Sequence, residues 1–200
     1  LVQDPSTRVV LVFLEGVKNG KKFIEAAEFA FRAKKPVVAF KTGRSEKGRL
    51  SVGSHTGSLA GSDDIYEALF KQHGVIRAYS IDEVIDIGMA LSWQPLPKGN
   101  RLGVVSTSGG ACSIIADNCE DVGLAVPDLT ESTTNSLTQL VPPIITVKNP
   151  LDTDWASQES HEKIIETISG DDNVDMILIS VAATIGRLGY TLAEAIVRAA

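Results

Sequence analysis

The sequence is poor in cysteine. Only two cysteines occur in its 200 residues, Cys112 and Cys119. On a helix this spacing separates them by roughly 10 Å, which is too far for a disulfide bond. We therefore expect two small, core-facing thiols in a reducing compartment, and so a cytoplasmic protein.

Long apolar runs and excess positive charge are also missing. No stretch approaches the roughly 20 apolar residues that cross a bilayer, so no membrane partner is expected. The formal net charge of −6 argues against a nucleic-acid binder, which needs a basic face. The motifs HExxH, paired CxxC and GxSxG do not occur, which removes support for metalloproteases, zinc ribbons and hydrolases, and no metal ligand is assigned.

The first half of the chain alternates short apolar runs with helical spacing. The continuous apolar run at residues 9–14 predicts a strand covered on both faces. Apolar residues at helical intervals over 23–31 predict an amphipathic helix, and residues 37–40 predict a second strand. Such a βαβ unit implies parallel strands with a right-handed crossover.

The second half repeats this alternation after a break. Prolines and a glycine within residues 93–100 indicate a linker, and residues 102–106 and 174–180 predict buried strands. Residues 124–126 predict a further short strand. We therefore expect an α/β protein of two tandem flavodoxin-like parallel-sheet domains, residues 1–94 and 101–200, joined by residues 95–100. Because the chain begins at Leu1 and ends within a helical pattern, we also expect a fragment of a longer polypeptide.

A histidine stands in a glycine-rich stretch after the second strand. Residues 42–58 predict a long loop, and His55 lies in it among small residues. A neutral imidazole is a good phosphoryl acceptor at pH 7, and flanking hydroxyls and N–H groups can hold phosphate oxygens. The alternative is a surface loop with an incidental histidine. The glycines of this loop are Gly43, Gly48, Gly53 and Gly57.

Three further candidates lie at predicted strand ends or turns. Glu15 follows the first strand, where a carboxylate can orient an imidazole or simply be a solvated acid. Thr107, Ser108, Gly109 and Gly110 form a small-residue turn before a helix, which suits an anion, a tight structural turn or a flavin phosphate. Asn149 to Asp152 lie in an irregular stretch that predicts a turn.

Taken together, these motifs resemble the NDP-forming acyl-CoA synthetase family, which includes ADP-forming acetate–CoA ligase and, more distantly, succinyl-CoA synthetase. The resemblance covers essentially the whole chain. It rests on these segments: Phe13-Leu14-Glu15-Gly16-Val17, Lys35-Pro36-Val37-Val38, Lys41-Thr42-Gly43-Arg44-Ser45, Ser54-His55-Thr56-Gly57-Ser58-Leu59-Ala60-Gly61, Val105-Ser106-Thr107-Ser108-Gly109-Gly110 and Asn149-Pro150-Leu151-Asp152.

The resemblance implies a role for each candidate. His55 matches the family's transiently phosphorylated histidine, and Glu15 matches the acid that orients it. The turn from Thr107 to Gly110 matches the start of a helix whose N-terminus holds the phosphoryl group. The implied reaction interconverts acyl-CoA, ADP and phosphate with a carboxylic acid, ATP and CoA. A role for Asp152 stays open.

The resemblance also implies partners outside these residues. CoA, ATP or ADP, and Mg²⁺ would be substrates bound mainly by a CoA-binding domain and by an ATP-grasp domain or subunit, in an oligomer. The acyl substrate, a small carboxylic acid, is left open. The alternative function is a regulatory or non-catalytic synthetase-like region, such as some protein acetyltransferases carry.

Overall fold

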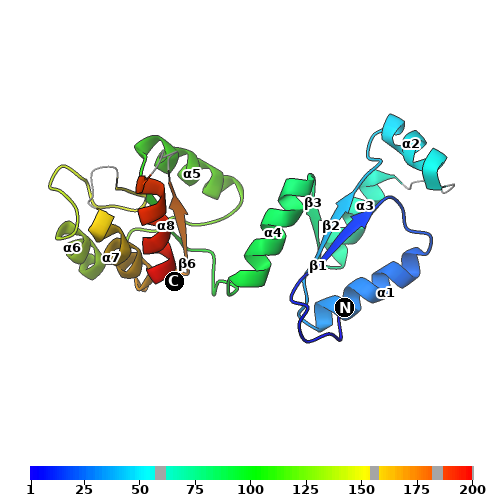
Figure 1. Cartoon of the computed structure of the whole chain (residues 1–200), viewed down its shortest axis with the longest axis horizontal. Coiled ribbons are helices and arrows are strands. Elements are labelled where there is room, and N and C mark those ends of the chain that lie inside the picture. The colour runs from blue at the N-terminus through cyan, green and yellow to red at the C-terminus, as the bar shows by residue number, and fades with distance from the viewer. Residues whose placement is uncertain (57–61, 154–157, 182–186, 200) are drawn as a thin grey trace. The chain divides into compact units, whose positions relative to one another are not determined.

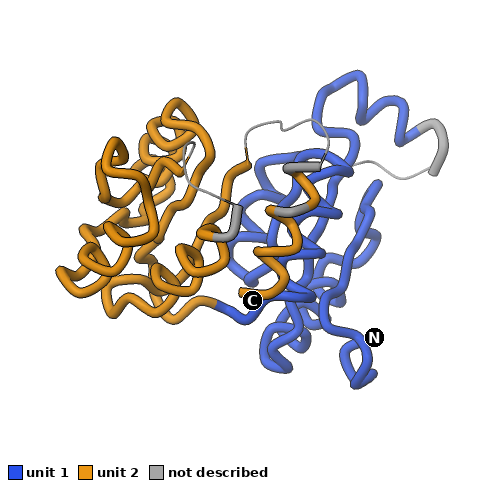
Figure 2. The backbone as a smooth tube through the Cα atoms, turned by 60° about the vertical axis from the view of Figure 1, so that its left-hand side comes forward, with its two compact units in different colours: residues 1–96 blue, residues 97–200 orange. Residues whose placement is uncertain are grey.

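The protein forms two compact units, Leu1–Leu96 and Pro97–Ala200 (Figure 2). A computed structural model describes residues 1–56, 62–153, 158–181 and 187–199. Each unit carries a three-stranded parallel sheet flanked by helices (Figure 1). This confirms the predicted fold class of two tandem α/β parallel-sheet units. Within the described ranges, none of the helices has both the length and the apolar character that a membrane crossing needs.

Unit 1 (Leu1–Leu96) has the strand order β1-β2-β3. Its elements are β1 (Val10–Leu14), α1 (Gly20–Arg32), β2 (Val37–Lys41), α2 (Glu46–Thr56), α3 (Asp63–Gln72), β3 (Val75–Ala78) and α4 (Ile81–Trp93).

Unit 2 (Pro97–Ala200) has the strand order β5-β4-β6. Its elements are β4 (Leu102–Ser106), α5 (Gly109–Asp121), α6 (Glu131–Thr138), β5 (Leu151–Asp152), α7 (Gln158–Ser169), β6 (Met176–Ser180) and α8 (Arg187–Ala199).

The central strand of unit 1, β2, is covered on both faces. Val38 and Ala39 are adjacent, so their side chains point to opposite faces, and both are fully buried. Ala39 packs in a cluster with Ala27 of α1 and Phe70 of α3. The other face is covered by α4, which contacts β2. A doubly covered central strand of this kind explains its unbroken apolar sequence.

The edge strand of unit 1, β1, is covered less than its sequence predicts. Leu11 is 49% exposed and Phe13 is 57% exposed. The prediction of a strand buried on both faces is therefore wrong for the described residues. The reason is that β1 stands at the edge of the sheet, where helix α4 reaches Leu11 through Gly88 but does not enclose the strand.

Helix α4 begins with a reciprocal cap. The Ser80 hydroxyl accepts a hydrogen bond from the Glu83 N–H at 3.1 Å. The Glu83 carboxylate accepts one from the Tyr79 N–H at 2.7 Å. Reciprocal bonds of this type satisfy N–H groups that a helix start otherwise leaves unpaired.

In unit 2 every residue of the central strand, β4, is buried. Val105 packs with Leu137 of α6 and Ile164 of α7 on one face. Val104 packs with Cys119 of α5 on the other. Both cysteines are buried. The strand predicted at residues 124–126 is only an isolated bridge between Arg101 and Ala125.

Candidate functional site

In unit 1 the carboxyl ends of β1 and β2 lie side by side. Leu14 of β1 is in register with Lys41 of β2, and the Thr42 N–H donates to the Leu14 carbonyl at 3.0 Å. Glu15 follows directly and is exposed. The predicted strand-end position of Glu15 is therefore observed, at the edge of the sheet where ligands of parallel α/β folds bind.

The segment that carries His55 is helical rather than a loop. The long loop predicted for residues 42–58 is wrong over Glu46–Thr56, which form α2 with His55 near its C-terminal end. The Ser45 hydroxyl accepts from the Gly48 N–H at 3.1 Å and so caps the helix. The helix lacks apolar periodicity because Leu50 and Val52 are its only large apolar residues, so its sequence looked like a loop.

A glycine makes the approach to α2 possible. Gly43 has φ of +70°, a conformation that side-chain-bearing residues rarely adopt. A β-carbon at this position would also lie 3.2 Å from the Val52 side chain. Gly43 therefore sets the direction in which the chain leaves β2 and enters α2.

Two parts of the predicted histidine site lie outside the described residues. Nothing is described of the side chain of His55, and residues 57–61, which include Gly57 and Ser58, are likewise outside the described ranges. The structure therefore places the backbone of His55 in α2 and Glu15 at the end of β1, both within unit 1.

Two buried cations, Lys41 and Arg77, lie at or near the strand ends of unit 1, and the sequence does not predict their burial. Arg77 of β3 hydrogen-bonds to Asp63 at 2.6 Å and to Glu67 at 2.7 Å. Burial opposes the charge on Arg77, but these bonds outweigh burial and raise its pKa above the usual value. Lys41 is 1% exposed although it ends a strand. A single lysine or arginine in a strand pattern gives no sign of its burial, since such residues usually lie outside.

In unit 2 the turn between β4 and α5 is tightly hydrogen-bonded. The Ser106 hydroxyl accepts from the Ser108 N–H at 3.1 Å. Ser108 is the N-cap of α5, its hydroxyl accepting from the Ala111 N–H at 3.4 Å. The Thr107 N–H donates to the Ser180 carbonyl of β6 at 3.1 Å. The turn is thus fixed from within and from the neighbouring strand.

This turn presents a helix start to solvent. Gly109 and Gly110 are the first two residues of α5, and both are exposed. Backbone N–H groups at a helix start and the helix dipole together favour an anion. The predicted turn before a helix at Thr107, Ser108, Gly109 and Gly110 is therefore present, and anion binding there stays a prediction.

The stretch around Asn149 is predicted to be an irregular turn, but it contains a short strand preceded by a hydrogen-bonded asparagine side chain. Leu151–Asp152 form β5, paired with Val105 and Ser106. Ahead of it the Asn149 side chain accepts from the Val104 N–H at 2.9 Å and donates to the carbonyls of Leu102 and Pro127 at 2.8 and 2.9 Å. The asparagine amide thus continues the hydrogen bonding of the sheet edge, which a single sequence does not reveal.

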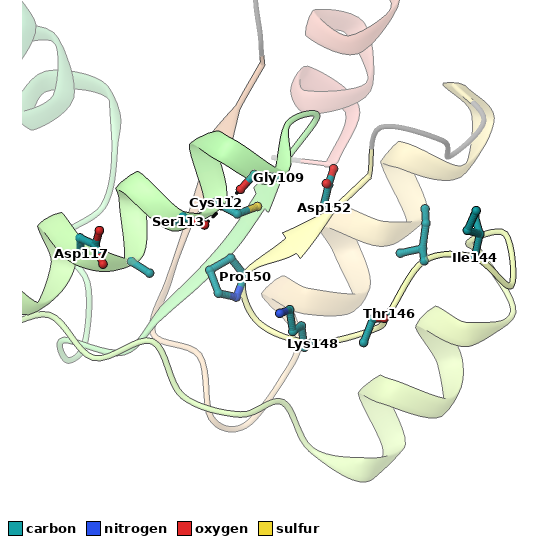
Figure 3. Close-up of a pocket in the computed structure, with 11 residues that line it drawn as sticks. Gly109, Cys112, Ser113, Asp117, Ile144, Thr146, Lys148, Pro150 and Asp152 are labelled. Atoms are coloured by element: carbon teal, nitrogen blue, oxygen red, sulfur yellow. Dashed lines mark hydrogen bonds between the residues drawn. The ribbon is translucent and has the colours of Figure 1, made fainter.

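Asp152 is brought against the first residue of α5. A β-carbon on Gly109 would lie 2.7 Å from the Asp152 carboxylate, so only glycine fits there without a shift. The sequence alone leaves the role of Asp152 open, and the structure places it beside the candidate anion site (Figure 3). A carboxylate at this position is itself stabilised by the helix dipole.

A cavity of about 590 Å³ opens beside this helix start, entirely within unit 2 (Figure 3). Burial raises the pKa of the Cys112 thiol on its wall, and the nearby Asp152 charge adds to this effect. The thiol is therefore protonated at neutral pH and unreactive. The cavity is lined by Gly109, Cys112, Ser113, Ala116, Asp117, Ile144, Ile145, Thr146, Lys148, Pro150 and Asp152.

The buried His161 contacts Thr153, which follows β5 and hydrogen-bonds to the end of β4. The Thr153 hydroxyl donates to the Ser106 carbonyl at 3.0 Å, and His161 Nε2 lies 3.2 Å from that hydroxyl. The Thr153 hydroxyl thus lies within hydrogen-bonding distance of both the Ser106 carbonyl and the imidazole. His161 is 4% exposed, so it is part of the interior of unit 2.

The predicted site residues fall in two groups. Glu15 and His55 belong to unit 1, and Thr107 to Gly110 belong to unit 2, which the structure describes as separate units. Over the residues that the structure describes, no cluster of His, Cys, Asp and Glu side chains could hold a metal ion.

Comparison with known proteins gives consistent results. Residues 1–91 match the family described as succinyl-CoA ligase like flavodoxin domain. The chain is 40% identical over its whole length to the acetate–CoA ligase [ADP-forming] II subunit alpha of Pyrococcus furiosus, 44% of which it covers. It is 34% identical over 98% of its length to a 4-hydroxybutyrate–CoA ligase [ADP-forming] of Nitrosopumilus maritimus, 28% of which it covers.

A solved structure agrees with these matches. The dinucleotide forming acetyl-coenzyme A synthetase 1 of Ca. Korarchaeum cryptofilum, in complex with phosphate and ADP, superposes with a TM-score of 0.85 at 33% identity, over 99% of this chain and 44% of that one. The chain thus spans less than half the length of each of these relatives.

Proposed function

Because the chain belongs to the NDP-forming acyl-CoA synthetase family, we propose that it works within an ADP-forming acid–thiol ligase. Such an enzyme interconverts acyl-CoA, ADP and phosphate with a carboxylic acid, ATP and CoA through a phosphohistidine. The observation that carries the proposal is the similarity of the whole chain to ADP-forming ligases, and this chain holds both the motif at His55 and the motif at Ser108–Gly110.

In this proposal the two units have different tasks. Unit 1 is the C-terminal part of the first succinyl-CoA synthetase-like domain and carries the phosphorylated histidine. Unit 2 is the second flavodoxin-like ligase domain and holds the phosphoryl group at the start of α5. The linker at residues 95–100 joins them.

The proposed reaction has three reversible steps. A phosphate oxygen attacks the thioester carbonyl, and the carbon–sulfur bond breaks to give acyl phosphate and CoA. The neutral imidazole of His55 then attacks phosphorus, and the carboxylate leaves. Finally a terminal oxygen of ADP attacks the phosphohistidine, so that the phosphorus–nitrogen bond breaks and ATP forms.

Glu15 and the α5 turn assist at separate points. The Glu15 carboxylate accepts the N–H of the second imidazole nitrogen, which orients the ring and stabilises the positive charge that phosphorylation creates. The N–H groups of Gly109 and Gly110 and the Thr107 and Ser108 hydroxyls bind phosphoryl oxygens. The exposed glycines at the helix start support this role, because they let a ligand approach the backbone closely.

The remaining substrates are assigned to regions outside this chain. CoA is bound by a CoA-binding domain, and ATP or ADP with Mg²⁺ by an ATP-grasp domain or subunit, in a cytoplasmic oligomer. The acyl group is a small carboxylic acid; relatives named for acetate and for 4-hydroxybutyrate leave its identity open. Nothing in the comparisons favours the regulatory alternative.

The proposal is tested by labelling the complete synthetase with γ-labelled ATP and magnesium. We expect a protein-bound phosphoryl group that is acid-labile and base-stable, and that His55→Ala abolishes. His73→Ala is the matched control in the same unit, because His73 Nδ1 contacts the Glu28 carboxylate at 3.2 Å and His73 is not at the carboxyl end of a strand. A label that survives in His55→Ala would refute the assignment.

A further inference from the structure

The cavity of unit 2 follows one face of α5. Its lining residues on this helix recur at intervals of three and four positions, which places them on one side: Gly109, Cys112, Ser113, Ala116 and Asp117. At 1.5 Å of rise per residue, this face extends about 12 Å from the helix start. The segment that precedes β5, together with Asp152, completes the lining (Figure 3). The cavity therefore begins at the proposed phosphoryl site and continues along the helix.

The proposed chemistry requires space for an acyl group next to the phosphoryl group. In an acyl phosphate the acyl carbon and the phosphorus are bonded to one shared oxygen. If the phosphoryl group is held at the start of α5, the rest of the acyl group must extend from that point. The cavity borders Gly109, the first residue of α5, and so provides this space within unit 2.

The lining of the cavity suits a neutral acyl tail. Ala116, Ile145 and Pro150 contribute apolar surface. The charged side chains in the lining are two carboxylates, of Asp117 and Asp152, and one ammonium, of Lys148. A second carboxylate on the substrate would meet this excess of negative charge, which disfavours dicarboxylic acids.

The size of the cavity exceeds what a two-carbon acid fills. Its volume of about 590 Å³ lies in the range of clefts that hold drug-sized ligands. Ala116 lies seven residues, or roughly two turns, beyond Gly109. Because its side chain is a single methyl group, the space at this depth stays open.

We infer that this cavity receives the acyl tail of the substrate and takes monocarboxylic acids larger than acetate, and that Ala116 sets the length of tail it holds. This inference rests on the proposed function, and it adds the class of acid and the residues that select it. The pantetheine arm of CoA is the other part of a thioester that could enter such a groove, and the test distinguishes the two occupants.

The test measures ATP consumption by the complete synthetase with CoA, magnesium and one acid at a time. We expect wild-type enzyme to use hexanoate and phenylacetate as well as acetate, and to use hexanoate better than the dicarboxylic adipate. Ala116→Phe fills the cavity two turns from Gly109, so the ratio of kcat/KM for hexanoate to that for acetate should fall about tenfold. Asn118→Phe is the matched control, because Asn118 is exposed on α5 and is not part of the cavity lining; it should keep the wild-type ratio.

A second variant avoids the risk that the added ring disturbs the fold. Asp117 is exposed, so Asp117→Asn should melt like the wild type. Because this variant removes one of the two carboxylates, the ratio of kcat/KM for adipate to that for hexanoate should rise about threefold. An unchanged ratio in Asp117→Asn would overturn the preference for neutral tails.

The outcomes separate this inference from the proposed function. A wild-type enzyme that takes no phosphoryl label on His55 overturns the proposed function. A labelled enzyme that uses acetate alone, or an Ala116→Phe variant that melts like the wild type and keeps its acid preference, overturns the acyl cavity only. An equal loss for all acids in Ala116→Phe, with a raised KM for CoA, would assign the groove to pantetheine and would also overturn it.

Discussion

The parallel strands of the two units carry different kinds of residues at their carboxyl ends. In unit 1 the strand ends carry full charges: Glu15, Lys41 and Arg77 with Asp63. In unit 2 they carry hydroxyl groups, such as that of Ser106 of β4, together with the Asp152 carboxylate at the end of β5. The same βα architecture therefore supports paired opposite charges at the strand ends of unit 1 and a backbone- and hydroxyl-rich turn beside the Asp152 carboxylate in unit 2.

This difference suits the two tasks proposed for the units. An imidazole that gains positive charge on phosphorylation needs a carboxylate of fixed position nearby. A dianionic phosphoryl group needs N–H donors that are already in place, because such donors require no rearrangement during the reaction. The variants below separate the two arrangements, starting with the largest expected effect.

The neutral network of unit 2 depends most on Asn149. Asn149→Ala removes hydrogen bonds to Leu102, Val104 and Pro127 and leaves partly buried backbone groups unpaired. We expect the free energy of unfolding of unit 2 to fall by about 3 kcal/mol. Hydrogen exchange of the β4 amides measures this change. Asn118→Ala on exposed α5 surface is the control, and equal losses in both variants would contradict the anchoring role.

The charged arrangement of unit 1 depends on Arg77. Arg77→Met leaves Asp63 and Glu67 without their cation, and because both acids are partly exposed we expect a loss of about 2 kcal/mol. Arg32→Met is the control, since Arg32 pairs with Glu28 on the surface at 3.6 Å. Urea unfolding followed in unit 1 compares the two. A more stable Arg77→Met protein would show that the ion pairs are dispensable.

The chain direction into α2 depends on Gly43. Gly43→Ala must hold a side chain at φ of +70° and against Val52, which we expect to cost about 1 kcal/mol. The loss should appear as faster hydrogen exchange in α2 and as less phosphoenzyme. Gly16→Ala is a clean control, because a β-carbon there meets nothing within 4 Å. Identical behaviour of both variants would remove the special role of Gly43.

The smallest effect concerns acid sensitivity in unit 2. Hydrogen bonds from Arg101 hold the pKa of Asp175 at about 2, below its ordinary value of 3.8. Because the pKa is lower in the folded state, this stabilisation is complete above pH 3.8 and is lost as the pH falls through about 2. Arg101→Gln should therefore flatten the pH dependence of stability in this window, as acid titration by circular dichroism would show. An unchanged curve would contradict the link.

The sequence allows the fold class to be predicted, because buried parallel strands have a distinctive apolar run. The sequence also predicts that Glu15 lies at a strand end. It predicts the Ser108–Gly110 turn before a helix, because a strand, small residues and a helical pattern follow one another there. Helix α2 is missed because its stability does not come from an apolar face. The exposure of Phe13 is missed because a sequence does not reveal which strand is at the edge.

The supporting residues of the site are harder to predict. Asn149, His161 and Lys41 act through contacts with residues distant in sequence or through burial, and their local patterns do not predict these contacts. A polar residue before a proline predicts a turn, and a lysine at a strand end predicts exposure. Only the packed structure shows that these side chains complete the sheet edge or balance a charge.

The central claim is that one histidine carries the phosphoryl group between the nucleotide and the acyl substrate. The most direct measurement is mass-spectrometric mapping of the phosphoryl group on the complete synthetase after exposure to ATP with magnesium, and separately after exposure to acyl-CoA with phosphate. The account predicts His55 as the modified residue from both directions. Modification of a different residue in either experiment, or labelling from one direction only, would contradict it.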